Sequence, residues 1–316
     1  MRKMTSIRVV ATLMAGNANS SRNSAGAMRQ MSNSSRRHQS RRILPLARPP
    51  DPSTLPVANC ASKLYDWFKG KSSVLVITGA AEINASSQEE LGLIGVRLNS
   101  CSSFDDLTPS CGDGLKDDTI SIVTQNVDML HAKAGTRHCL HLHGRGDLVS
   151  CQSCGFSMER TMYHHQLIAS NRDWYEKARY VTMDASKLRP DGDADLDGQV
   201  VYDELFLPAC PRCSNYNSFF KTSVVFFGDQ VPKHRFDLSY AAVDACDGVL
   251  CVGTSLAVHS AFRLTKRALH QNTPVCILNV GETRVEREGW QNSDLLTKIE
   301  SPIGRTLSAF MDTLDE

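Results

Sequence analysis

The sequence has no long apolar run, and this absence limits the classes of protein that it can encode. No stretch of the 316 residues approaches the roughly 18 to 20 consecutive apolar residues that a membrane-spanning helix needs. We therefore expect no membrane partner. Apolar residues make up 41% of the chain and charged residues 22%, a composition typical of a globular protein with a sizeable core. The length fits one large domain or two modest domains.

Aspartate and glutamate are absent from residues 1–50, which hold nine arginines and one lysine. The whole chain has a formal charge of only +1, so the basic character is confined to this tail. Arg-rich, Ser-rich and acid-free N-termini are typical of cleaved import signals. We predict a transit peptide at 1–50 and a location in the mitochondrial matrix. A disordered basic arm that contacts nucleic acid is the alternative, although we expect no nucleic-acid partner.

Four of the eleven cysteines form two pairs with C-x-x-C spacing. Cys151 and Cys154 lie in CQSC, and Cys210 and Cys213 lie in CPRC. Each tight turn points two thiolates at one centre, and four thiolates make the tetrahedral shell that a structural zinc prefers. Because these ligands leave no position for water or substrate, we predict one structural zinc ion. A pair of disulfides is the alternative, which a reducing compartment disfavours.

Short apolar runs alternate with helix-length amphipathic stretches. The runs are 74–78 (VLVIT), 120–124 (ISIVT), 224–227 (VVFF), 249–253 (VLCVG) and 275–279 (VCILN), and two of the helical stretches are 236–245 and 260–271. This alternation predicts an α/β fold, with a doubly wound parallel, Rossmann-like sheet covered on both faces. We expect residues 54–150 and 214–316 to form this domain, with a small zinc-binding module inserted at 151–213.

Polar residues follow several of the predicted strands, where ligands bind in parallel sheets. They are Gly79, Gln125, Asn126, Asp128, Gly228, Asp229, Thr254, Ser255 and Asn279. This pattern favours a nucleotide site. The alternative is helix capping, by Asn126 and Asp128 for a helix from Met129 and by Thr254 and Ser255 for a helix from Ser260.

Several strings resemble the sirtuin family in order and spacing. They are TQNVDMLHAKAG (124–135), LHLHG (140–144), CQSC, CPRC, SVVFFGD (223–229), VGTSL (252–256) and LNVG (278–281). PDGD at 190–193 and the N-terminal tail are most similar to the class II, mitochondrial branch represented by sirtuin four. The resemblance implies an NAD-dependent protein deacylase, a lipoamidase or deacetylase, and/or a mono-ADP-ribosyltransferase. Its partners would be acylated or ADP-ribosylated mitochondrial proteins, and its cofactors NAD and one zinc ion.

The resemblance also implies roles for individual residues. In the family mechanism the acyl-lysine oxygen attacks the ribose carbon that releases nicotinamide, and a histidine, here His143, then activates a ribose hydroxyl. Asn126 and Asp128 would orient the reacting groups. The acyl-lysine peptide would add as a strand beside Phe227, Gly228 and Asp229. The residues implied to contact NAD are Gly79, Ala80, Gln125, Asn126, Val127, Asp128, Gly253, Thr254, Ser255, Asn279, Val280, Gly281 and Ile303.

The resemblance fails after the first predicted strand. Ala81 stands where sirtuins carry the second Gly of a Gly-Ala-Gly turn, and its methyl group obstructs close approach to a phosphate. No Pro-Asp-Phe-Arg string follows. We therefore predict weak or absent turnover. The open explanations are a defective gene model or splice form, and a real variant with impaired NAD binding, which would be a zinc-stabilised binding protein.

A calcium loop is a separate alternative for one acidic segment. The residues that satisfy its spacing are Asp193, Asp195, Asp197, Gly198 and Glu204. Pro190 and Pro208 interrupt the two helices that should flank such a loop, which disfavours this interpretation.

Overall fold

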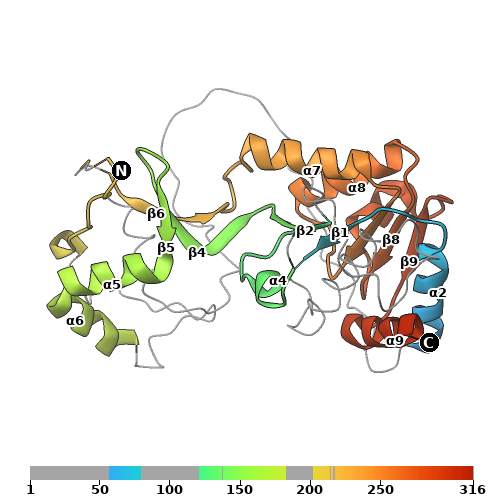
Figure 1. The fold of residues 1–316 in the computed structure, drawn as a ribbon, viewed down its shortest axis with the longest axis horizontal. Coiled ribbons are helices and arrows are strands. Elements are labelled where there is room, and N and C mark those ends of the chain that lie inside the picture. The colour runs from blue at the N-terminus through green and yellow to red at the C-terminus, as the bar shows by residue number, and fades with distance from the viewer. Residues whose placement is uncertain are drawn as a thin grey trace. The chain divides into compact units, whose positions relative to one another are not determined.

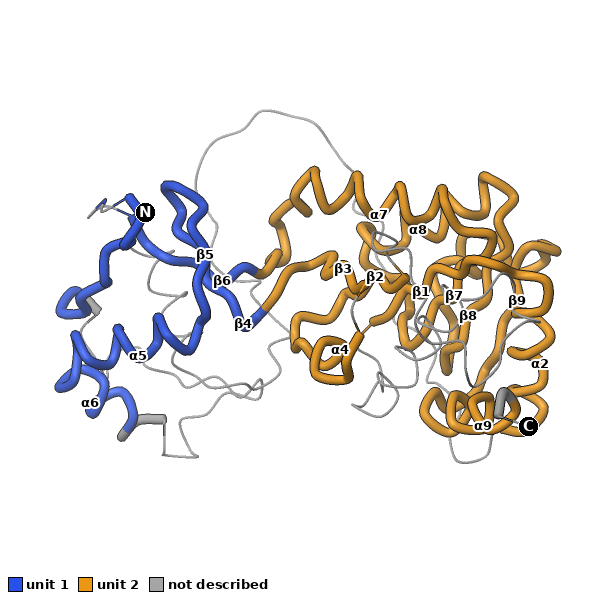
Figure 2. Tube along the Cα trace, in the orientation of Figure 1, with its two compact units in different colours: residues 1–44, 146–223 blue, residues 45–145, 224–316 orange. Residues whose placement is uncertain are grey.

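The computed structural model describes residues 57–79, 121–136, 138–182, 202–213, 215 and 218–315. They divide into a smaller unit within 146–223 and a larger unit within 45–145 and 224–316, shown in different colours in Figure 2. The predicted transit peptide, Ala80, Ala81 and all of the calcium loop except Glu204 lie outside the described residues. Among the described helices, none combines the length and apolar character needed to span a bilayer.

A six-stranded parallel sheet forms the centre of the larger unit, in the order β3-β2-β1-β7-β8-β9 (Figure 1). Its strands are β1 (Val74–Thr78), β2 (Ile122–Thr124), β3 (Cys139–His141), β7 (Gly248–Val252), β8 (Val275–Leu278) and β9 (Leu296–Ile299). The chain runs outward from β1 to one edge and then continues from β7 to the other edge. This confirms the predicted Rossmann-like α/β fold.

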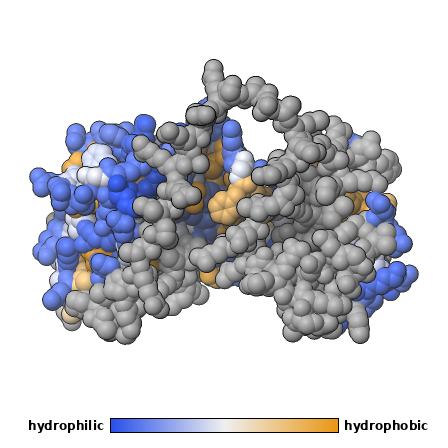
Figure 3. Space-filling view, turned by 180° about the vertical axis from the view of Figure 1, so that it is seen from behind, coloured by the Kyte–Doolittle hydropathy of each residue, from blue (hydrophilic) through white to orange (hydrophobic). Residues whose placement is uncertain are grey.

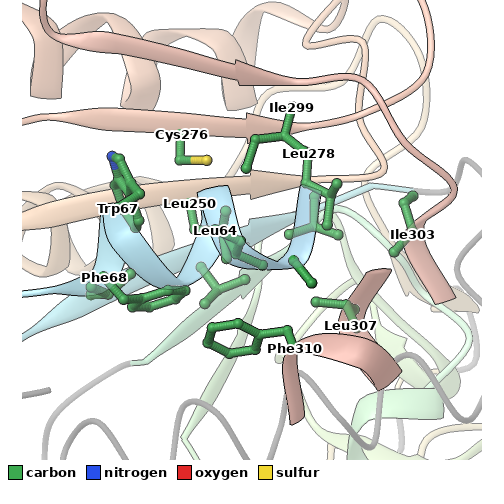
Figure 4. Close-up of a cluster of buried hydrophobic side chains, with 14 of the residues drawn as sticks. Leu64, Trp67, Phe68, Leu250, Cys276, Leu278, Ile299, Ile303, Leu307 and Phe310 are labelled. Atoms are coloured by element: carbon green, nitrogen blue, oxygen red, sulfur yellow. The ribbon is translucent and has the colours of Figure 1, made fainter. Parts of the chain in front are cut away.

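Of the helices in the described residues, four cover the two faces of this sheet. On one face, α2 (Ala58–Phe68) and α9 (Ile303–Asp315) pack with alternate strand residues in a core that Figure 4 shows in close-up. The other face holds α7 (Lys233–Ala245) and α8 (His259–His270). Successive side chains of a strand point to opposite faces. Because both faces of the sheet are covered, the side chains on both faces of a central strand are buried, which favours apolar residues there. All five residues of β1 are buried accordingly.

The smaller unit has a three-stranded sheet in the order β5-β4-β6. Its strands are β4 (Gly144–Cys151), β5 (Ser157–Glu159) and β6 (Phe220–Val224), and its helices are α5 (Arg160–Ser170), α6 (Arg172–Thr182) and the 3-10 turn η4 (Tyr202–Glu204). Its buried cluster contains Val149, Tyr163, Leu167 and Phe220 together with Cys151 and Cys210. A core this small gains little from apolar burial alone.

Two sequence predictions about strands need correction. The apolar run 224–227 was predicted to be a strand of the large sheet, but β6 ends at Val224 and belongs to the small sheet. The chain then turns, with Gly228 at a φ of +93° and Phe227 87% exposed. Apolar character there marks an exposed turn, not a buried strand. Strands β3 and β9 were not predicted, because each is short and carries polar residues.

Candidate nucleotide site and cysteine cluster

The four paired cysteines converge in the smaller unit. Their Sγ atoms all lie within 4.8 Å of one another, with 3.8 Å between Cys151 and Cys213 and 3.7 Å between Cys154 and Cys210. A tetrahedral zinc with Zn–S bonds of about 2.3 Å places its sulfurs about 3.8 Å apart. The separations are too long for a disulfide, whose S–S bond is about 2.05 Å. The cluster therefore suits one structural zinc ion.

Ionisation of Cys151 is favoured before any metal binds. Burial opposes the thiolate, but hydrogen bonds from the N–H groups of Cys154 and Ser153 and from the side chains of Ser218 and Cys210 together lower the pKa of Cys151 to about 6. The Ser153 N–H lies 3.4 Å from the sulfur. A thiolate at neutral pH is the form that binds zinc.

In the larger unit, the carboxyl ends of β1, β2, β7 and β8 lie in register. Thr78 pairs with Thr124 and with Val252, and Val252 pairs with Leu278. The residues that follow these strands are therefore brought to one edge of the sheet, as the sequence pattern predicts. Figure 1 shows how the strands lie side by side.

Gln125 ties two of these strand ends together. Its side-chain Nε2 donates to the Thr78 carbonyl at 3.2 Å and to Thr254 Oγ1 at 2.9 Å. Its backbone N–H also donates to Thr78 O at 2.9 Å. Thr254 Oγ1 in turn accepts from the N–H of Leu256 at 3.1 Å. The side-chain amide of Gln125 thus links the ends of β1 and β7.

Two glycines let the ends of β1 and β7 approach closely. A Cβ on Gly79 would lie 2.7 Å from Thr254 Cβ and 2.8 Å from Gly253 O, distances that real side chains do not tolerate. Gly253 itself has a φ of +60°, in the left-handed region that favours glycine. Nearby Leu256, buried and with a φ of 53°, holds the strained turn that follows Ser255.

His143 lies beside this edge, two residues after the last residue of β3. Its Nδ1 lies 3.2 Å from the Gln125 carbonyl oxygen, and its Nε2 lies 2.7 Å from Ser260 Oγ. The His143 carbonyl accepts from the Val225 N–H at 2.8 Å, which fixes the backbone. His141 is directed to a different group, with Nδ1 3.4 Å from Asn126 O.

The environment of His143 favours the neutral imidazole. Burial lowers its pKa from 6.5, the positive charge of Arg235 lowers it further, and the hydrogen bond to Gln125 raises it. The ring also lies against the first turn of α8, whose N-cap residue Val258 makes no side-chain cap. The positive end of a helix macrodipole disfavours a cation there. A neutral histidine can accept a proton near neutral pH.

Asn126, which follows β2 at this edge of the sheet, carries a buried polar atom. Its side chain is 7% exposed, and among the described residues its Oδ1 has no hydrogen-bond partner. A buried acceptor without a donor is costly, so a ligand that donates to it is favoured.

Asp128 is exposed and its Oδ1 accepts from the Leu130 N–H at 3.0 Å, at the start of α4 (Leu130–Lys133). Asp128 therefore makes the helix-capping contact that the sequence left as an alternative.

The capping alternative is wrong for Thr254 and Ser255. Helix α8 begins at His259 with Val258 as its N-cap residue, without a side-chain cap. Thr254 Oγ1 instead accepts hydrogen bonds from Gln125 Nε2 and from the Leu256 N–H. The carbonyl of Ser255 accepts from the Arg284 N–H at 2.9 Å.

A network of ionic groups holds the loop after β8. Asn279 is buried, and its Nδ2 donates to Val280 O at 2.8 Å. The N–H of Gly281 donates to Glu300 at 2.9 Å, and Lys298 donates to Gly281 O at 2.7 Å. Both flanks of Gly281 are thus fixed. The loop precedes the π-helical turn η5 (Glu286–Trp290).

Phe227, Gly228 and Asp229 form an exposed turn. Asp229 N–H donates to Phe226 O at 2.9 Å, and Asp229 Oδ2 accepts from Phe226 N at 3.3 Å. Figure 3 shows hydrophilic residues over much of the coloured surface that it draws, with smaller hydrophobic areas among them. Among the large hydrophobic residues that the structure describes, Phe227 is the most exposed, at 87%.

Two other residues predicted to contact NAD have apolar side chains. Ile303 is 3% exposed and packs in the core between α2 and α9, where Figure 4 labels it. Val127 is half-buried beside Asn126. Ser260 and Arg235 were not predicted as site residues. The sequence predicted Ser260 only as the start of a helix. Its contact with His143 could not be predicted locally, because the two residues are 117 positions apart.

The geometry thus defines a class of protein. Its members have a parallel sheet of the nucleotide-binding type and a separate four-cysteine cluster. Residues 114–260 match the family described as the Sir2 family. This segment contains His143, the ends of β2 and β7 and all four cysteines. The segment of this chain that holds the candidate site is thus similar to the Sir2 family, the sirtuins.

Curated relatives agree with this match. An NAD-dependent protein deacetylase of Xanthomonas campestris pv. campestris (strain 8004) is 39% identical over 188 residues, which cover 59% of this chain and 58% of that protein. The NAD-dependent protein deacylase SIR4 of Monosiga brevicollis is 39% identical over 166 residues, 52% of each protein. The chain thus spans just over half the length of these relatives.

A solved structure shares the fold. It is a mutant Sir2 homologue in complex with ADP-ribose, 19% identical, with a TM-score of 0.50. The match covers 80% of this chain and 95% of that one. At this identity the likeness establishes the fold alone.

Proposed function

We propose that this protein is an NAD-dependent protein deacylase that removes acyl groups from lysine side chains. The observation that carries the proposal is the position of His143. A neutral imidazole is held by Gln125, whose side chain also joins the ends of β1 and β7. The relatives with this segment are named as NAD-dependent deacetylases and deacylases.

The residues at the strand ends fit a dinucleotide. Asn126 offers a buried acceptor to a hydroxyl or amide donor. Gly253 and the turn at Thr254 provide backbone that a phosphate or ribose can approach, and the fixed loop at Asn279 would hold the adenosine end. When bound, NAD would supply the ribose carbon that loses nicotinamide and accepts the acyl oxygen. His143 would take up a proton from a hydroxyl at Nε2, its acceptor nitrogen.

The finer assignment rests on the sequence. We propose the class II, mitochondrial branch of the sirtuins, a matrix location, and acylated or ADP-ribosylated mitochondrial proteins as partners. Mono-ADP-ribosyl transfer is included because it begins with the same loss of nicotinamide. Phe227 to Asp229 would present the edge for the modified peptide.

A second candidate function is a zinc-stabilised binding protein with an impaired cofactor site. The observation that favours it is the sequence after β1, where Ala81 replaces the expected glycine and Pro-Asp-Phe-Arg is missing. Each charge-assisted hydrogen bond lost around a pyrophosphate costs about 1.5 to 3 kcal/mol. The two candidates predict different rates at the same site.

Nicotinamide release separates these candidates. We expect slow release from labelled NAD by the full chain, dependent on an acyl-lysine peptide and well below the rate of a deacetylase such as the Xanthomonas relative assayed in parallel. Panels of acetyl, lipoyl and longer acyl peptides would identify the preferred group. Release that no peptide stimulates would contradict the deacylase proposal, and no release with retained NAD binding would support the binding protein.

A further inference from the structure

The hydroxyl group of Ser260 is hydrogen-bonded to Nε2 of His143, the nitrogen that the proposed chemistry requires as a proton acceptor. The distance from His143 Nε2 to Ser260 Oγ is 2.7 Å, which is shorter than the 3.2 Å from Nδ1 to the Gln125 carbonyl oxygen. Ser260 is the second residue of α8, and His143 follows β3, so two separate elements meet at this bond. Both residues belong to the larger unit.

The two partners of the ring define its tautomer. A carbonyl oxygen can only accept, so Nδ1 carries the proton that is donated to Gln125 O. In the neutral ring Nε2 is then the acceptor, and the Ser260 hydroxyl donates to it. Every hydrogen-bonding position of the imidazole is satisfied, and the lone pair of Nε2 points at Ser260.

We propose that Ser260 is a positioning residue, whose hydroxyl holds the Nε2 lone pair of His143 in a fixed direction at the first turn of α8. This inference rests on the proposed deacylase function for its catalytic consequence, but the hydrogen bond itself does not. Without the hydroxyl the ring would keep only the bond to Gln125, about which it can tilt. A misplaced base loses rate even when substrate binding is unchanged.

A competing role for the same hydroxyl is blockage. A substrate hydroxyl must reach Nε2, and a serine that only occupies this nitrogen would have to be displaced first. The two roles differ in sign. Removal of a positioning hydroxyl lowers kcat, whereas removal of a blocking hydroxyl raises kcat.

Ser260→Ala is the direct test, because it removes one oxygen and leaves the helix former alanine in α8. We expect kcat for deacylation to fall about tenfold, with KM for the peptide nearly unchanged. Ser260→Thr, which keeps the hydroxyl, should recover most of the rate. Ser239→Ala is the matched control, since this buried serine of α7 donates only to Phe236 O, away from His143.

Nitrogen NMR of the histidine rings, without NAD or peptide, tests the bond independently of activity. We expect the unaltered chain and Ser239→Ala to show His143 as the Nδ1–H tautomer with a hydrogen-bonded Nε2, and Ser260→Ala to lose the hydrogen-bonded signature. An unchanged Nε2 resonance in Ser260→Ala, or a higher kcat, would overturn the proposal. If no variant is active, the NMR result alone decides it, and the failure then belongs to the proposed function.

Discussion

Replacing His143 with glutamine is expected to lower the rate of deacylated peptide formation at least about 100-fold, the scale at which a positioned general base contributes. Glutamine keeps a polar side chain at the site but has no group that accepts a proton near neutral pH. The unaltered chain is itself expected to be slow, so product should be counted by mass spectrometry over long incubations.

His141→Gln is the matched control for this substitution. It lies two residues away at the end of β3, and its Nδ1 lies 3.4 Å from the Asn126 carbonyl, not from Gln125. Its loss should change the rate much less. Equal effects of the two substitutions, or a His143→Gln variant that keeps its rate, would contradict the role assigned to His143.

The acidic limb of the pH profile should report the same residue. Because the pKa of His143 is lowered from 6.5, its neutral form persists below that pH. Activity should therefore hold at mildly acidic pH and fall only as the pH drops through the lowered pKa. The limb should disappear from the residual activity of His143→Gln.

Replacing Cys210 with serine is expected to abolish zinc binding and to unfold the smaller unit. The buried cluster of this unit includes Cys151 and Cys210 among only a few large apolar side chains. Binding of zinc by such sites contributes about 10 to 16 kcal/mol at neutral pH, so the fold should depend on the metal. Zinc content by mass spectrometry and limited proteolysis within 146–223 measure the two effects.

Cys246→Ser provides the control for this experiment. Cys246 follows α7 in the larger unit and donates to Val243 O at 3.2 Å, outside the four-cysteine cluster. The Cys246→Ser variant should therefore keep its zinc and its resistance to proteolysis. Zinc retained by Cys210→Ser, or no zinc in the unaltered chain, would contradict a four-thiolate site.

Buried strands were the most predictable part of this protein. In the run 74–78 the first four residues are apolar and all five are buried, because both faces of the sheet are covered. The spacing of the cysteines likewise predicted their convergence, since a C-x-x-C turn fixes two sulfurs locally.

Contacts between distant residues could not be predicted from local pattern. The run 224–227 has the apolar composition of a buried strand, yet Phe227 is exposed because the chain turns at Gly228. His143 is hydrogen-bonded to the backbone carbonyl of Gln125 and to Ser260 at the start of a helix. Neither a backbone carbonyl nor a serine at a helix start forms a sequence pattern that would predict this contact. The sequence left open whether Asp128 caps a helix, and the hydrogen bond that it accepts from the Leu130 N–H shows that it does.

NAD is expected to bind across the carboxyl ends of β1, β2, β7 and β8, and every role proposed for the strand-end residues depends on this. Hydrogen–deuterium exchange of the full chain at millimolar NAD tests this directly, since weak binding is saturated there. We predict slower exchange at 125–128, 253–256 and 279–281, with little change in α5 and α6. Exchange that NAD leaves unchanged at all three strand ends would contradict the account.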